Sequence, residues 1–376
     1  MTPEGPPRNL GARLAEPASG SGRRSSDSGG TKQAGRAEGA LQTVTAASPE
    51  ADLIGYYGGA ASDVYFQRAR ATLAGAHVDA VVAMDFFSSR AGVLCGVAEA
   101  VRLLSGILQE GDQAWAMAEG AAMDRKETVL RIRAPYSRFG VYETALLGML
   151  SSCSGWATAA HEIVDAAGGK RVISFGARHV HPLIGPTMEY SAVIGGCAGC
   201  ATPLGAQLAG LQGASGTMPH AMILLFGDTV KAALAFDENM PDDVLRIVLV
   251  DTFKDEAEEA LRVAEALGKR LRGVRLDTPG ERGGVTVDLV KEVRARLDLA
   301  GFSHVGIFVS GGLDAARIRE FEAANCPIHS YGVGMAISSA PPIAFTADIK
   351  EISGKAMTKR GRIPGVANNP RLIRVI

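Results

Sequence analysis

Four short runs late in the chain, each followed at once by acidic or glycine residues, decide the fold. The first two read Arg-Ile-Val-Leu-Val (246–250) before Asp251-Thr252, and Gly-Val-Arg-Leu (273–276) before Asp277-Thr278-Pro279-Gly280. The next two read His-Val-Gly-Ile-Phe-Val (304–309) before Ser310-Gly311-Gly312, and Ile-His-Ser-Tyr (328–331) before Gly332-Val333-Gly334. Helical spacing of apolar residues separates them, over 255–267, 285–297 and 313–324. Strands alternating with helices predict a parallel α/β sheet, closed or open.

The residues that follow these strands indicate a phosphorylated sugar as the ligand. In parallel barrels the catalytic side chains come from the carboxyl ends of the strands, and the last glycine-rich loops commonly bind phosphate. Two carboxylates come first here and two glycine-rich turns last. Each piece alone is weak, because a Gly-Gly pair is often only a tight turn and an Asp often only caps a helix. Four such ends in succession favour the ligand interpretation.

Composition excludes several classes of protein. The 376 residues are 47% hydrophobic, enough for a large core in two or three domains. With 39 basic and 40 acidic residues the net charge is -1, which gives no case for binding nucleic acid or a membrane surface. No apolar run approaches the ~18 residues of a membrane helix, and no secretory signal is evident, so we expect a cytoplasmic protein.

The chain divides into four parts. Residues 1–48 are rich in Gly, Ser, Ala, Arg and Pro, and we expect them to be disordered. Residues 49–170 predict an α+β domain that ends in a long connecting helix, with strands at 81–84 and 127–132 and helices at 93–108 and 141–166. Residues 171–345 predict the α/β barrel that carries the active site, beginning with a strand at 171–174. Residues 346–376 are expected to return to the N-terminal domain.

Two segments before the alternating region carry further candidates. Phe175 and Arg178 follow the strand 171–174, where Arg could clamp a carboxylate and Phe could stack on a flat heterocycle. A solvated loop with a core Phe is the alternative. In Gly216-Thr217-Met218-Pro219-His220, the proline suits a first helical turn before an apolar helix to about residue 236. A neutral His220 there could attack a phosphoryl group, or be purely structural.

The five cysteines are odd in number, so a disulfide framework is not expected. Cys197 and Cys200 form a C-x-x-C, which could be a redox or metal pair. No second pair completes a zinc site, so two small residues in a Gly/Ala-rich turn is the favoured interpretation.

These motifs together resemble the nicotinate phosphoribosyltransferase family, which is related to the nicotinamide and quinolinate enzymes. The resemblance covers about residues 50–365 and is closest to the short archaeal-type members. The matching pieces are Ser62-Asp63-Val64-Tyr65-Phe66, Phe175-Gly176-Ala177-Arg178, Gly216-Thr217-Met218-Pro219-His220, Arg275-Leu276-Asp277, Ser310-Gly311-Gly312-Leu313 and Tyr331-Gly332-Val333-Gly334.

The resemblance implies an irregular TIM-like barrel of the quinolinate phosphoribosyltransferase type with an N-terminal α+β domain. It also implies a homodimer or higher oligomer with shared sites. Nicotinate would stack between Phe175 and the partner's Tyr65, with Asp63 beside it and Arg178 on its carboxylate. The remaining implied roles concern phosphoribosyl pyrophosphate and belong to Arg275, Asp277, Ser310, Gly311, Gly312, Gly332, Gly334, Lys355 and Lys359.

The implied chemistry forms nicotinate mononucleotide and pyrophosphate, with Mg²⁺ on the diphosphate and ATP as co-substrate. His220 matches the histidine that the family phosphorylates, and Asp251 and Asp277 could hold ribose hydroxyls or metal-bound water. Nicotinamide or quinolinate as the acceptor, and a non-catalytic metabolite-binding relative, stay open. An unrelated barrel lyase would need a Schiff-base lysine in a core strand, and Lys254 lies only just past one.

Overall fold

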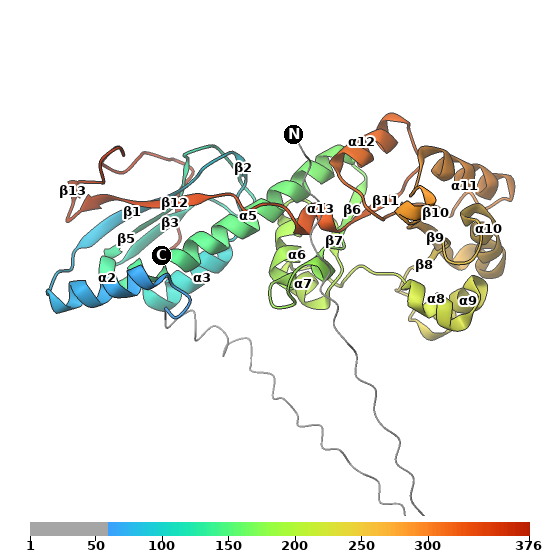
Figure 1. Ribbon diagram of the computed structural model, residues 1–376, viewed down its shortest axis with the longest axis horizontal. Coiled ribbons are helices and arrows are strands. Elements are labelled where there is room, and N and C mark those ends of the chain that lie inside the picture. The colour runs from blue at the N-terminus through green and yellow to red at the C-terminus, as the bar shows by residue number, and fades with distance from the viewer. Residues whose placement is uncertain (1–58) are drawn as a thin grey trace, which may run out of the picture. The chain divides into compact units, whose positions relative to one another are not determined.

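The structure is a computed structural model, and it describes residues 59–376. The segment 1–48, which the sequence predicts to be disordered, lies outside the described residues. Two six-stranded sheets organise the described part (Figure 1). A small additional pair is formed by β2 (Gly92–Val93) and β4 (Ala122–Met123).

The first sheet is antiparallel and takes strands from both ends of the described chain. Its order is β13-β12-β1-β5-β3-β14. The early strands are β1 (Val81–Ser88), β3 (Gln113–Ala116) and β5 (Thr128–Pro135), and the late ones are β12 (Phe345–Ile352), β13 (Lys355–Ala356) and β14 (Ile373–Arg374). β12 pairs with β1 and β14 pairs with β3. The last three strands of the chain therefore complete a sheet that β1, β3 and β5 begin.

Two helices cover the apolar face of this sheet. These are α3 (Val97–Ile107) and the 24-residue α5 (Glu143–Ala166), and they bury Val82, Met84 and Phe86 of β1 in one core. Two further helices, α2 (Val64–Gly75) and α4 (Tyr136–Phe139), pack against each other in the same part of the chain. The predicted helix at 93–108 is wrong at its start: residues 92–93 form β2, and Gly96, with φ 92°, is the N-cap of α3. A left-handed residue cannot continue a helix, so the helix begins four residues late.

The second sheet is parallel throughout and curls on itself. Its order is β7-β6-β11-β10-β9-β8. The strands are β6 (Arg171–Ser174), β7 (Gly199–Cys200), β8 (Arg246–Leu249), β9 (Leu271–Leu276), β10 (Gly306–Val309) and β11 (Ser330–Val333). Because the last strand, β11, pairs with the first, β6, the sheet closes there, and its opening lies between β7 and β8. This confirms the predicted irregular TIM-like architecture.

An extended segment crosses the opening of the barrel. The amide of Ser215 donates to the carbonyl of Cys200 at 2.7 Å, beside β7. Two residues later, Thr217 accepts a hydrogen bond of 2.9 Å from Arg275 on β9. The segment thus runs from the β7 edge to the side chain of Arg275 on β9, and it ends at His220, the first residue of the next helix, whose Nε2 lies 2.9 Å from Asp251 after β8.

Helices follow the strands on the outside of the barrel. They are α6 (Gly185–Ile194), α7 (Pro203–Leu208), α8 (His220–Phe226), α9 (Thr229–Asn239), α10 (Glu256–Leu267), α11 (Val287–Leu299), α12 (Ala315–Ala323) and α13 (Met335–Ser338). The predicted single helix from His220 to about residue 236 is wrong. Gly227, with φ 69°, ends α8, and the Asp228 side chain caps α9 by accepting from the Lys231 amide.

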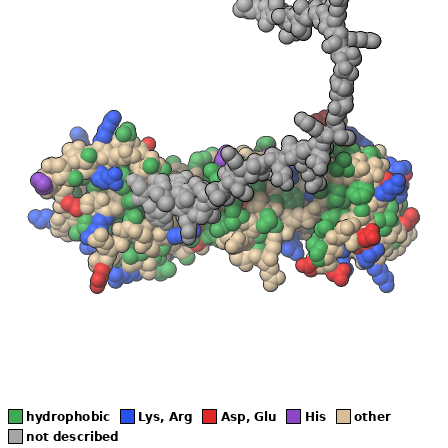
Figure 2. Space-filling view, turned by 90° about the horizontal axis from the view of Figure 1, so that it is seen from below, with side chains coloured by type: hydrophobic (Ala, Val, Ile, Leu, Met, Phe, Trp, Pro, Cys, Tyr) green, Lys and Arg blue, Asp and Glu red, His purple; other side chains and the backbone are tan. Residues whose placement is uncertain are grey.

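The outer side of α8 is apolar and exposed. Leu224, Leu225 and Phe226 are 58%, 89% and 45% exposed. Figure 2 shows hydrophobic side chains among charged ones on the face of the molecule that it presents. An exposed apolar helix end of this kind is typical of surfaces that contact another protein.

Two glycines of α5 give opposite predictions for the same substitution. A Cβ on Gly155 would lie 2.6 Å from the carbonyl oxygen of Pro341, whereas a Cβ on Gly148 would meet nothing within 4 Å. Gly155→Ala should lower the free energy of unfolding by about 1–3 kcal/mol, because the chain before β12 must move away. Gly148→Ala should raise it by about 0.4–1 kcal/mol through a lower entropy of the unfolded chain.

Chemical denaturation of the full chain measures both values. A Gly155→Ala protein as stable as Gly148→Ala would mean that the helix and the chain before β12 do not approach this closely.

Candidate active site

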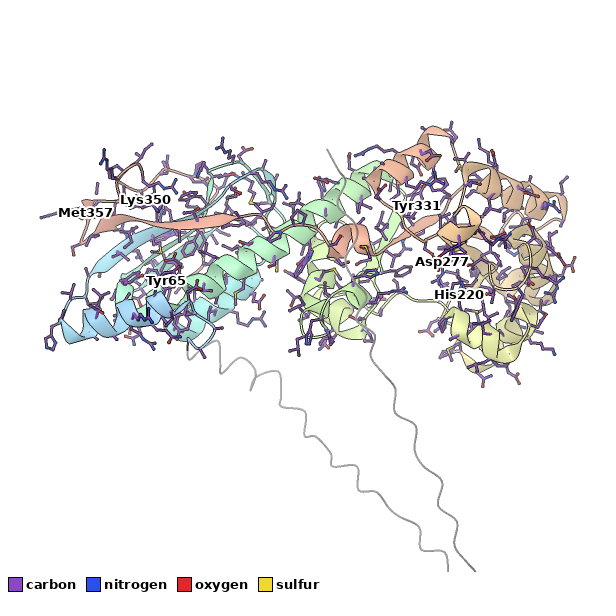
Figure 3. The ribbon with its side chains drawn as sticks, in the orientation of Figure 1. Tyr65, His220, Asp277, Tyr331, Lys350 and Met357 are labelled. Carbon is purple, nitrogen blue, oxygen red and sulfur yellow. The ribbon has the colours of Figure 1, made fainter. Side chains whose placement is uncertain are left out.

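Charged side chains from several connections meet at the carboxyl edge of the parallel sheet. Asp251 follows β8, Arg275 is the penultimate residue of β9, Asp277 follows β9 and Ser310 follows β10. Figure 3 shows His220 and Asp277 next to each other at this edge. The structure therefore brings together the predicted residues of the barrel, as parallel strand ends require.

His220 and Asp251 form a pair. The Nε2 atom of His220 lies 2.9 Å from Oδ2 of Asp251, whose side chain is only 2% exposed, while that of His220 is 38% exposed. Burial raises the pKa of Asp251, the nearby Asp277 adds to this rise, and His220 opposes it. A carboxylate only accepts hydrogen bonds, so in a neutral imidazole Nε2 carries the proton and Nδ1 is the free nucleophile.

Asp277 is held by the neighbouring strand connection. The hydroxyl of Ser310 donates to its Oδ1 at 2.7 Å. A Cβ on Gly311 would lie 3.1 Å from the same oxygen, and Gly311 has φ 89°. Gly311 thus lets the backbone pass close to the carboxylate, in a conformation that other residues rarely adopt. Nothing lies within 4 Å of the corresponding position on Gly312.

Arg275 points its guanidinium at an aromatic ring. Its Cζ lies 5.8 Å from the ring centroid of Phe175, and its Nη1 donates to Thr217. Burial lowers the pKa of Arg275, and the positive charge of Arg178 lowers it further, while Asp277 and Asp251 oppose both effects. Arg178 is exposed and finds no hydrogen-bond acceptor among residues 59–376. Two guanidiniums and one aromatic ring therefore share one end of the site.

The glycines after β11 make room for side chains from the connection after β6. A Cβ on Gly332 would lie 2.3 Å from Cε2 of Phe175, so the ring of Phe175 lies directly on the Gly332 backbone. A Cβ on Gly334 would lie 2.8 Å from Cε1 of His179, at the end of the short 3₁₀ turn η2 (Ala177–His179). The absence of a side chain at Gly332 and Gly334 thus determines where Phe175 and His179 lie.

Four buried polar atoms at this edge have no hydrogen-bond partner within the described part of the chain. They are Ser174 Oγ, Asp251 Oδ1, Thr252 Oγ1 and Arg275 Nε. Buried polar atoms are normally paired, so unpaired donors and acceptors at one edge are typical of a site that binds a polar ligand. A separate cavity of about 820 Å³ opens at Asp277, lined by the loop after β9 and by Gly311, Gly312 and Arg317.

The remaining predicted residues form a second group on the antiparallel sheet. Asp63 lies before α2 and accepts from Thr144 at 3.0 Å, and Tyr65 on α2 is 58% exposed. Lys359 lies 3.4 Å from the buried Asp348 of β12, and Lys355 starts β13. Among residues 59–376 no hydrogen bond or ion pair joins these four to His220 or Asp277, and Figure 3 shows Tyr65 apart from both.

Cys197 and Cys200 are buried free thiols beside β7. Burial raises the pKa of Cys197 to about 12 and that of Cys200 to about 11, which leaves little thiolate at neutral pH. The fully buried Glu189 holds this turn by accepting from the amides of Ala201 and Thr202. Both thiols are thus packed in the core, as the favoured interpretation expects, but Cys200 lies in strand β7 and not in a turn.

Several residues of the site were not predicted. Thr217 lies within the motif Gly216-Thr217-Met218-Pro219-His220. Its hydroxyl, two residues before Pro219, was the one feature of the sequence that could have indicated a polar contact. Glu143, the first residue of α5, lies beside Asp348, Tyr65 and Lys359. Glu189 and Glu256 are buried acids on helices, and a sequence alone gives no sign that such acids face inward.

Metal binding would depend on the substrate as well as on the protein. Within residues 59–376 no three His, Cys, Asp or Glu side chains form a ready metal site. Mg²⁺, however, is usually held by one or two carboxylates together with substrate phosphates and water. The buried Oδ1 of Asp251, which has no partner, and the nearby Asp277 fit that kind of donor set.

Among the described helices, none is long and apolar enough to span a membrane.

The sequence patterns of two protein-family domains match nearly all of the described chain. Residues 63–154 match the quinolinate phosphoribosyl transferase N-terminal domain, and residues 156–348 match its C-terminal domain. A solved structure titled nicotinate-nucleotide pyrophosphorylase, from Pyrococcus furiosus, is 46% identical with a TM-score of 0.78. The alignment covers 83% of this chain and 80% of that one.

Curated relatives are more distant and longer. Nicotinate phosphoribosyltransferase pncB2 of Mycobacterium tuberculosis is 33% identical over 267 residues, 69% of this chain and 56% of that protein. The Bacillus subtilis nicotinate phosphoribosyltransferase is 29% identical over 60% of this chain and 46% of its own length. The chain thus spans about half the length of these relatives. Human nicotinic acid phosphoribosyltransferase, at 19% identity and TM-score 0.65, shares the fold.

Glu143 gives a prediction about the pH dependence of stability. Burial, and then the charge of Asp348, raise its pKa to about 7, while Lys359 opposes the rise. A raised carboxyl pKa means that the folded protein loses stability as the pH rises from about 4.5 through 7, where the carboxyl ionises. Glu143→Gln should therefore raise the free energy of unfolding at pH 8 by roughly 1–3 kcal/mol, with a gain that shrinks toward pH 4.5.

Denaturation curves at several pH values measure this effect. The exposed Glu162 on the same helix supplies the control, because Glu162→Gln should change stability little at any pH. A gain for Glu143→Gln that is independent of pH would contradict the assignment.

Proposed function

The chain belongs to the phosphoribosyltransferase family that acts in nicotinate and quinolinate metabolism, and on that premise we propose that it is a nicotinate phosphoribosyltransferase of NAD biosynthesis and salvage. It would join nicotinate to phosphoribosyl pyrophosphate and release nicotinate mononucleotide and pyrophosphate. The observation that carries this proposal is the set of Phe175, Arg178 and Arg275 at one end of a site with Asp251 and Asp277 at the other.

The first half of this set suits an anionic heterocycle. Phe175, fixed on Gly332, offers a ring for stacking, and the guanidinium of Arg178 offers bidentate donors to a carboxylate, with the positive charge of Arg275 nearby. Nicotinamide carries no carboxylate and would leave this positive charge unpaired. The names of two relatives, nicotinate phosphoribosyltransferase and nicotinate-nucleotide pyrophosphorylase, both refer to nicotinate.

The second half suits a phosphorylated sugar. Asp277, oriented by Ser310, is placed to accept from ribose hydroxyls, and Gly311 and Gly312 open their backbone to the cavity of about 820 Å³. Asp251 and Asp277 would hold Mg²⁺ together with the diphosphate. When bound, Mg²⁺ would neutralise charge on the leaving pyrophosphate. The protein's own part is to hold the ring nitrogen of nicotinate in line with the anomeric carbon.

ATP would act through His220. With Nε2 directed to Asp251, the exposed ring offers Nδ1 to the terminal phosphorus of ATP, and ADP would leave. Asp251 would stabilise the imidazolium character that develops during the attack. Quinolinate as the acceptor is less well supported, because its chemistry gives no role to a paired histidine at this position.

A second copy of the chain would complete the site. Asp63, Tyr65, Lys355 and Lys359 lie on the antiparallel sheet and α2, without contact to the barrel edge within one chain. An exposed Tyr65 is suited to stack on a base bound by another copy, and the two lysines to pair with its diphosphate. The exposed apolar end of α8 is compatible with such an assembly.

An assay of three bases tests the proposed reaction. Phosphoribosyl pyrophosphate is incubated with nicotinate, nicotinamide or quinolinate, each with and without ATP and Mg²⁺, and the mononucleotide is measured. We expect product from nicotinate alone and a faster rate with ATP. No product from any base would overturn the proposal in favour of a metabolite-binding protein, and product from quinolinate with carbon dioxide would assign the alternative reaction.

His220→Ala should abolish the stimulation by ATP and leave slower turnover without ATP. Asp251→Asn should reduce the stimulation by about 10–100-fold, because a neutral amide lacks the negative charge that stabilises the imidazolium and no longer fixes the tautomer of His220. Phosphorus NMR of the enzyme after ATP treatment should show phosphate on Nδ1 of His220. The matched control is His304→Ala. His304 lies just before β10, at the opposite edge of the sheet, and its Nε2 lies 3.3 Å from the carbonyl oxygen of Gly268. Full ATP stimulation in His220→Ala would remove His220 from the mechanism.

A further inference from the structure

A buried carboxylate lies directly behind the loop that carries Asp277. Glu256 is the first residue of α10 and is only 2% exposed. Its Oε1 accepts a hydrogen bond of 2.8 Å from the hydroxyl of Thr278, which is itself 5% exposed. Its Oε2 lies 4.0 Å from Arg282, further along the same loop. Glu256 does not line the cavity, whereas Asp277 and Thr278 do.

These contacts continue into a chain that crosses three strand connections. Glu256 follows β8, Thr278 and Asp277 follow β9, and Ser310 follows β10. Glu256 holds Thr278, the backbone joins Thr278 to Asp277, and Ser310 donates to Asp277 at 2.7 Å. Asp277 is thus fixed from both sides, by Ser310 directly and by Glu256 through the neighbouring residue.

The loop after β9 is rich in glycine, and its own contacts are the 3₁₀ turn η4 (Gly280–Arg282) and a hydrogen bond from Arg317 to the carbonyl of Val285. It contains Gly280, Gly283 and Gly284, and the last two have φ of 94° and 70°. Glycines allow many backbone conformations, so such a loop needs anchors outside itself. A buried carboxylate is a costly choice for stability alone, because an apolar side chain of similar size often stabilises a core as well or better. The position at the first turn of α10, near the positive end of the helix dipole, lowers that cost.

We propose that Glu256 is a positioning residue for phosphoribosyl pyrophosphate: through the hydroxyl of Thr278 it sets the orientation of Asp277 toward the bound sugar. This inference rests on the proposed function, since it takes Asp277 as the residue that binds the ribose. Small displacements of a binding group reduce affinity and rate strongly, by as much as about 100-fold for 1 Å. Glu256 itself touches no substrate, and its contribution is to binding of the sugar and not of the base.

Three variants separate positioning from stability. Glu256→Leu and Thr278→Val each leave the other partner buried without its hydrogen bond, so each should lower Tm. Each should also raise the KM for phosphoribosyl pyrophosphate, and its Kd by calorimetry, by about tenfold, with the KM for nicotinate unchanged. The double variant Glu256→Leu/Thr278→Val buries two apolar groups and should recover much of the Tm. Its Kd for phosphoribosyl pyrophosphate should stay raised.

Two controls complete the experiment. Thr278→Ser keeps the hydroxyl and should retain the wild-type Kd. Glu259→Leu removes another fully buried acid of α10, one that pairs with Arg262, and should lower Tm without changing the Kd. A Kd that recovers together with Tm in the double variant, or a wild-type Kd in Glu256→Leu, overturns the inference and leaves the proposed function intact. A wild-type chain that does not bind phosphoribosyl pyrophosphate overturns both.

Discussion

The parallel pairing of the second sheet is the constraint on which the candidate site depends. Because β6, β8, β9, β10 and β11 run in the same direction, residues far apart in sequence leave the sheet at one edge. The pairing tolerates little variation where backbones approach closely: a Cβ on Gly273 of β9 would lie 2.3 Å from the ring of Phe308 on β10. The parallel arrangement brings the charge of Asp277 near enough to act on the pKa of both Asp251 and Arg275.

That edge keeps polar atoms buried at a cost to stability. Asp251 Oδ1 and Arg275 Nε are buried without partners in the described chain, and an unpaired buried group costs about 1–3 kcal/mol. A ligand that supplies an acceptor for the guanidinium and a donor or cation for the carboxylate would recover this free energy on binding. The same atoms thus weaken the empty protein and strengthen its complex, which is the expected relation between a preorganised polar site and stability.

The sequence predicted the parallel part of the fold well because its signals are local. β-branched runs, helical spacing and the residues that follow each strand all lie within a few positions of one another, and β6 was predicted at its observed bounds. Errors arose where one glycine changed the backbone, as at Gly96 and Gly227, because helical spacing continues through such a residue while the helix does not. The barrel residues were found from motifs. Glu189 and Glu256 were not, because only tertiary packing shows that a helical acid faces inward.

The division of the predicted residues between two sheets has a physical consequence. Tyr65 and Lys359 lie near Glu143, and Lys359 lies near Asp348 of the antiparallel sheet, whereas His220 and Asp277 lie at the edge of the parallel one. A ring stacked on Phe175 would have one face against Phe175 and a second face for another partner. Water competes well for a singly stacked, charged heterocycle, so a second aromatic surface would exclude that water and strengthen the pairing of its carboxylate with Arg178. In the assembly that we propose, the exposed Tyr65 of a neighbouring copy would supply such a surface. Assembly would then strengthen binding of the base through Tyr65 and binding of the diphosphate through the two lysines.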